Sequence, residues 1–146
     1  MIAALEEKHS QAFRQLVGDL SLLPDNTWLE LNPKGAIDRV FAPFFRYADA
    51  HQEVFYLDCG RDKKDEPTLR NLFDKILRLR QPGIPPKQRL LYAHMLESIL
   101  VGPSQTFCRT NGIGKKEWTE EMVWAQAAYL QSIEERHSTK PADQAA

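Results

Sequence analysis

The chain has 146 residues, of which 42% are hydrophobic and 27% are charged, and this is the composition of a globular protein large enough for one core. These values exclude a collagen-like or disordered chain, and a formal net charge of -1 gives no overall attraction to nucleic acid or an anionic membrane. No apolar run reaches the ~18 residues of a membrane span. The first residues lack the pattern of a secretory signal, so we expect a cytoplasmic protein that does not bind a membrane.

The two cysteines, Cys59 and Cys108, stand far apart and form no metal-binding or redox spacing. Neither a disulfide framework nor a zinc site is therefore encoded. We expect two buried, reduced thiols, no bound metal and no other cofactor.

A first amphipathic helix is predicted from the apolar residues between Leu5 and Leu23, which recur at helical steps among charged residues. Pro24 and the two residues after it form a turn, so this helix ends before them. The next stretch, Thr27 to Leu31, is too short and alternates too poorly for a strand. We expect it to be extended.

A second helix is predicted to begin at Asn32, whose side chain caps it, with Pro33 in the first helical position. Pro43 interrupts its apolar stripe and removes one backbone hydrogen bond, which predicts a kink or a break into two short helices. Glu53 to Cys59 is rich in β-branched and aromatic residues. We favour a continuing helix there, and leave open one short two-stranded β element with Thr27 to Leu31.

The clearest helix is predicted for Asp65 to Arg80, which has an acidic first turn, an apolar stripe and a basic end. The stiff sequence QPGIPP follows, and Pro86 fits the first turn of the next helix. Lys87 to Val101 is apolar around most of its circumference, which predicts a central helix ended by the Gly-Pro pair after it.

Ser104 to Lys116 has two glycines and no helical stripe, so we expect a loop of about a dozen residues, a length often found in functional loops. A last helix is predicted from Glu117 to Arg136, and residues 138–146 have the composition of a disordered tail. The expected fold is all-α, with residues 1–137 forming a single compact bundle of five or six helices.

No standard catalytic or nucleotide-binding motif is present in the sequence. The predicted loop contains five candidates for phosphate or thiol chemistry: Cys108, Arg109, Asn111, Lys115 and Lys116. The glycines beside them lack the preceding strand of a phosphate-binding turn, and no histidine near Cys108 supplies a base. We therefore favour an ordinary loop. His94 and Glu97 share a helix face, but in the reverse order of a carboxylate-bridged metal site, and we expect a hydrogen-bonded core histidine.

Residues 61–90 contain nine basic and four acidic side chains, although the whole chain is slightly acidic. The basic residues that flank QPGIPP are candidates for contacts with phosphates or an acidic partner: Arg70, Arg78, Arg80, Lys87 and Arg89. Stacking aromatics and a helix-turn-helix spacing are missing, which favours a protein over nucleic acid. Aromatic residues of the N-terminal half, among them Trp28 and Phe45, are candidates for an exposed anchor patch.

These observations predict a non-enzymatic interaction protein, such as an accessory, immunity-type or regulatory factor, that binds an acidic or apolar surface of another protein. A nucleic-acid accessory protein that uses residues 61–90 is one alternative. A small thiol- or metal-dependent enzyme is the other. Whether the chain dimerises stays open at this point.

Overall fold

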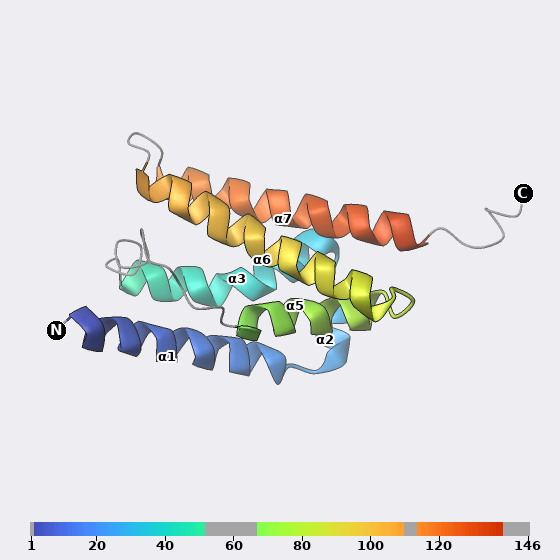
Figure 1. The fold of residues 1–146 in the computed structure, drawn as a ribbon, viewed down its shortest axis with the longest axis horizontal. Coiled ribbons are helices and arrows are strands. Elements are labelled where there is room, and N and C mark those ends of the chain that lie inside the picture. Colours follow the sequence, from blue (N-terminus) through green and yellow to red (C-terminus); the bar gives the residue numbers. More distant parts are fainter. Residues whose placement is uncertain (1, 52–66, 110–113, 139–146) are drawn as a thin grey trace, which may run out of the picture.

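A computed structural model of the chain describes residues 2–51, 67–109 and 114–138. In these ranges the chain forms six helices and no strand (Figure 1): α1 (Ile2–Ser21), α2 (Asp25–Glu30), α3 (Pro33–Ala50), α5 (Pro67–Arg80), α6 (Pro86–Arg109) and α7 (Lys115–Ser138). The predicted all-α class is confirmed. Among these described helices, none combines the length and the apolarity that crossing a membrane requires.

The long helices lie side by side in an elongated bundle (Figure 1), with α3 and α5 in its middle. On one side α1 packs against both of them, and on the other α7 packs against α3 while α6 packs against α5. α6 and α7 also contact each other, and the short α2 packs against α5. At the centre, the buried rings of Phe41 and Phe73 lie 6.3 Å apart.

The first two helices confirm one prediction and correct another. α1 ends at Ser21, before Pro24, as the turn residues predict. Thr27 to Leu31, expected to be extended, lies largely within α2, and this removes one strand of the two-stranded element that the sequence left open. A six-residue helix is too short to show a period. Burial of Trp28 outweighs the weak local preference of this segment.

α3 begins as predicted, because the Asn32 side-chain oxygen accepts a hydrogen bond from the backbone N–H of Gly35 at 2.7 Å and Pro33 occupies the first turn. Of the kink or break predicted at Pro43, the break into two short helices is wrong, since one helix runs through this residue. Pro43 deprives the Arg39 carbonyl of its helical donor. Arg39 is exposed, so water can take that donor's place. The prediction for residues 53–59 lies outside the described residues.

α5, rather than α6, is the central helix. Its predicted apolar stripe is buried at Leu72, Phe73, Ile76 and Leu77. α5 contacts α1, α2 and α6. The main neighbours of α6 are α5 and α7. A third side of α6 therefore faces solvent and leaves Leu90, Leu91 and Met95 exposed by 47%, 57% and 42%. The prediction that this helix lies inside the bundle is wrong for that side.

The connector between α5 and α6 turns as predicted, and Pro86 opens α6. The predicted end of α6 is wrong, because the helix continues through Gly102 and Pro103 to Arg109. A helical Gly costs about 1 kcal/mol and a Pro removes one backbone bond. Figure 1 shows this last part of α6 running beside α7, which α6 contacts. The first half of the expected loop is therefore helical.

α7 confirms the last predicted helix and carries one buried polar side chain. Gln126 is fully buried, and its Nε2 donates a hydrogen bond to the backbone oxygen of Leu96 in α6 at 2.9 Å. Met122, Val123 and Ile133 are buried beside it, whereas Ala125, which follows Met122 and precedes Tyr129 at helical spacing and so is predicted on the same apolar face, is exposed. The buried face of α7 is thus rotated from the one that the apolar spacing predicts.

Candidate functional site

Arg80, predicted to contact a partner, binds within the molecule instead. Its side chain is only 9% exposed, and its Nε donates a hydrogen bond to the carboxylate of Glu134 in α7. Its Nη1 donates to the backbone oxygen of Trp28, at 2.6 Å, and to that of Leu31. These are carbonyls that the end of α2 leaves without helical partners. The guanidinium of Arg80 therefore joins α2, α5 and α7.

Arg70 and Arg89 are also used inside the molecule. Arg70 of α5 pairs with Glu97 of α6 at 2.8 Å, and Arg89 of α6 pairs with Asp74 of α5 at the same distance. Both arginine side chains are largely buried. Each helix supplies the arginine of one ion pair and the carboxylate of the other, so the two pairs join α5 to α6. Neither side chain extends into solvent towards a partner.

Only two of the five basic candidates face solvent. Arg78 is 54% exposed and lies 3.7 Å from Asp74, and Lys87 is exposed at the start of α6. The expectation of one basic surface made by all five residues is therefore corrected. A charge count along the sequence cannot reveal it, because Glu97 and Glu134, the partners of Arg70 and Arg80, lie outside residues 61–90, and the count does not show that Asp74 pairs with Arg89.

The two aromatic candidates differ in position. Trp28 is fully buried and belongs to the core, so the prediction that it forms part of an exposed anchor is wrong. The reason is that α2 turns its side chain against α5. Phe45 is partly exposed, and its ring stacks on Phe41 at a centroid distance of 5.8 Å. One side of Phe45 remains available and lines a pocket.

The loop candidates are divided between two helices. Cys108 and Arg109 lie in the last turn of α6, and Lys115 begins α7. Lys116 is exposed, and Asn111 lies outside the described residues. The single loop that was expected to present all five residues together is thus not what the structure has.

The predicted pairing of His94 with Glu97 is replaced by another contact. Glu97 accepts from Arg70, and His94 is partly exposed rather than in the core. Within the ranges that the structure describes, no three His, Cys, Asp or Glu side chains are grouped as metal ligands would be.

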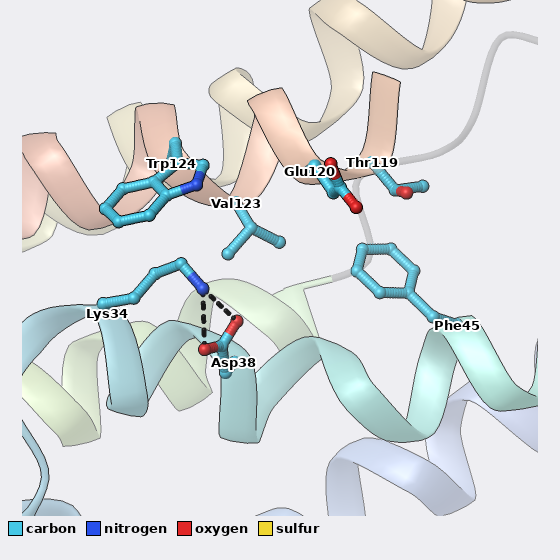
Figure 2. Close-up of a pocket in the computed structure, with 7 residues that line it drawn as sticks. All are labelled: Lys34, Asp38, Phe45, Thr119, Glu120, Val123 and Trp124. Carbon is cyan, nitrogen blue, oxygen red and sulfur yellow. Dashed lines mark hydrogen bonds and ion pairs between the residues drawn. The ribbon is translucent and has the colours of Figure 1, made fainter. Parts of the chain in front are cut away.

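An open pocket of about 190 Å³ lies between α3 and α7 (Figure 2). α3 contributes Lys34, Asp38 and Phe45, and α7 contributes Thr119, Glu120, Val123 and Trp124. The two helices run in opposite directions here. In Figure 2, Lys34 near the start of α3 faces Trp124, whereas Phe45 faces Thr119 near the start of α7. The pocket has an aromatic ring at each end, with Val123 between them.

Lys34 connects the two walls of the pocket. Its ammonium donates to both carboxylate oxygens of Asp38, at 2.9 and 2.8 Å, and lies 4.9 Å from the ring centre of Trp124. Attraction between a cation and the face of an indole ring adds to the ion pair. The side chains of Lys34 and Asp38 are 33% and 51% exposed, so this arrangement remains in contact with water.

No protein-family model, curated protein or solved structure matches the chain. The function is therefore inferred from the geometry of the molecule itself. The all-α fold by itself specifies no activity, because one fold supports many functions.

Sequence reasoning missed Trp124, although one signal was present. Trp124 is 58% exposed, and it lies two residues from Met122, which puts the two side chains on nearly opposite sides of α7. A tryptophan on the same side of a helix as Glu117, Glu120 and Glu121 is unusual enough to mark a contact surface. Lys34 carried no comparable signal, since its contact with Trp124 joins residues far apart in the sequence.

A second polar cluster joins the start of α6 to the end of α7. The buried hydroxyl of Tyr92 accepts from Gln88 Nε2 and shares a hydrogen bond with His137 Nε2, both at 2.8 Å. Beside it, burial raises the pKa of Tyr129, and a hydrogen bond and the positive charge of Arg136 oppose this rise. These contacts hold the ends of two helices together.

Proposed function

We propose that this chain is a non-enzymatic interaction domain, a regulatory or accessory factor, that binds another protein at the α3–α7 pocket. The observation that carries the proposal is Trp124, which is 58% exposed at the edge of that pocket. Tryptophan presents a large apolar area to water and is enriched among the residues that contribute most to binding.

The composition of the pocket supports the same proposal. Val123 is buried at its centre, and the polar side chains of Lys34, Asp38 and Glu120 surround it. An apolar centre within a polar rim is the usual arrangement of a protein interface. The pocket is open and lies between the antiparallel helices α3 and α7, which suits an inserted side chain of a partner.

We assign the partner to this pocket rather than to the basic residues near QPGIPP. Arg70, Arg80 and Arg89 form ion pairs inside the molecule, and a partner that used them would have to break those pairs. The same reasoning weighs against phosphate contacts by these three side chains.

The experiment places a photo-crosslinking residue at the pocket. Trp124→p-benzoylphenylalanine is expected to crosslink to one partner in an extract of the source cells. The matched control carries the same residue at Leu91, which is 57% exposed on α6 and does not line the pocket. Covalent adducts are identified by mass spectrometry.

A discrete adduct at position 124 and not at position 91 supports the proposal. Loss of that partner from affinity purification in the variant Trp124→Ala is then expected as well. The same adducts at both positions, or none at position 124, would refute it.

A further inference from the structure

The α3–α7 pocket combines the groups that bind a cation. Trp124 offers the face of an indole ring, and Asp38 and Glu120 bring one carboxylate from each helix. Aromatic faces and carboxylates together are the surroundings that ammonium and guanidinium groups prefer.

One cation already occupies this place. The ammonium of Lys34 lies between the Asp38 carboxylate and the Trp124 ring, at 2.8 Å from the nearer oxygen and 4.9 Å from the ring centre. A cation of another molecule can take the same position between the carboxylate and the ring. The Lys34 side chain is long and 33% exposed, and moving its ammonium into solvent breaks the contacts with Asp38 and Trp124.

The net charge of the side chains that line the pocket favours such a cation. Two carboxylates, Asp38 and Glu120, stand against the single ammonium of Lys34. In Figure 2 the dashed lines join Lys34 to Asp38, and none of them reaches Glu120. Glu120 is exposed on α7 and leaves the pocket with an excess of one negative charge.

We infer that the pocket recognises an arginine side chain of the partner, whose guanidinium takes the position of the Lys34 ammonium on Trp124 and Asp38. This inference rests on the proposed function and specifies the chemistry of the partner. Arginine suits the site better than lysine, because its planar group stacks on a ring and donates two parallel hydrogen bonds to one carboxylate. Lys34 then acts as a competitor within the molecule.

The test titrates the protein with the peptide acetyl-Gly-Arg-Gly-amide and follows the indole N–H resonance of Trp124 by NMR. A dissociation constant in the millimolar range is expected, since a single side chain binds. The neutral peptide acetyl-Gly-Gln-Gly-amide is expected to leave the resonance unmoved. The resonance is assigned from its absence in the variant Trp124→Ala.

Variants separate this inference from a general charge effect. Lys34→Met removes the internal competitor and should tighten binding about fivefold. Lys87→Met removes the same charge from an exposed position on α6 and should change binding far less. Adding Asp38→Asn to Lys34→Met should abolish the gain. Thermal unfolding of each variant checks that the fold is intact.

Three results would overturn the inference: no binding of the arginine peptide, an equal response to the glutamine peptide, or equal tightening by Lys34→Met and Lys87→Met. If position 124 crosslinks to a partner while the arginine peptide does not bind, the arginine chemistry is wrong and the proposed function stands. If the peptide binds and no partner is captured, the proposed function fails instead.

Discussion

Replacing Arg80 by methionine removes the contacts that join α2, α5 and α7 and keeps a side chain of similar length. The substitution takes the ion-pair partner from Glu134, whose side chain is only 16% exposed. It also leaves the backbone oxygens of Trp28 and Leu31 without their charged donor. The packed rings of the core are left unchanged.

The expected loss of stability is large for one residue. Removing one partner of a buried ion pair costs about 4 kcal/mol, because the remaining charge is left desolvated. Domains of this kind unfold with about 5–15 kcal/mol, so Arg80→Met should remove a large share of the total. Adding Glu134→Leu should return about 1–2 kcal/mol, since the isolated carboxylate is then gone while the two backbone oxygens stay unpaired.

Urea unfolding followed by far-UV circular dichroism measures these differences. The matched control is Arg78→Met, the same substitution two residues earlier in α5 at a side chain that is 54% exposed. Its effect should stay within about 0.5 kcal/mol. A loss below about 1 kcal/mol for Arg80→Met, or a double variant no more stable than the single one, would contradict the structural role of Arg80.

The remaining predictions concern α3 and Tyr129. Asn32→Ala should lower the free energy of unfolding by about 1 kcal/mol by removing the helix cap, while Asn32→Asp should keep it, as measured by urea unfolding. Gly35→Ala should bring no gain in the same assay, because its Cβ would lie 3.0 Å from the capping oxygen of Asn32. The raised pKa of Tyr129 favours the neutral form of its side chain in the folded protein. Its contribution to stability is therefore complete below the ordinary tyrosine pKa, and it is lost as the pH rises from that value through the raised pKa of the folded state. Tyr129→Phe should therefore weaken the loss of stability at alkaline pH, and an unchanged alkaline transition would contradict this.

Local signals were enough to predict most of the helices. The cap at Asn32 and the proline that opens α6 act through contacts a few residues away, so the sequence displays them directly. The stripe of α5 is long enough to show its period. α2 was missed because it packs against α5, which is distant in the sequence. The end of α6 was missed because the Gly-Pro pair predicts that the helix stops there.

The candidate site was predictable only in part, and Phe45 is the single predicted partner-binding residue that lines the pocket. The burial of Arg80 depends on Trp28, Leu31 and Glu134, which lie 52, 49 and 54 residues away. Such partners are invisible to a count of charges within one segment. Trp124 had a sequence signal in its position opposite Met122, whereas the meeting of Lys34 with that ring is a product of the fold.

The hydrogen bond from Gln126 to Leu96 joins α7 to α6 and also determines how α7 is rotated about its own axis. α7 carries apolar residues on several sides, so hydrophobic burial alone permits more than one rotation of this helix about its axis. Only one rotation brings the Gln126 amide to a backbone oxygen of α6, and that rotation is the one that turns Trp124 towards solvent. A buried amide on one side of α7 thus sets which aromatic ring the opposite side displays, and a change at position 126 is expected to alter the exposure of Trp124, which it never touches.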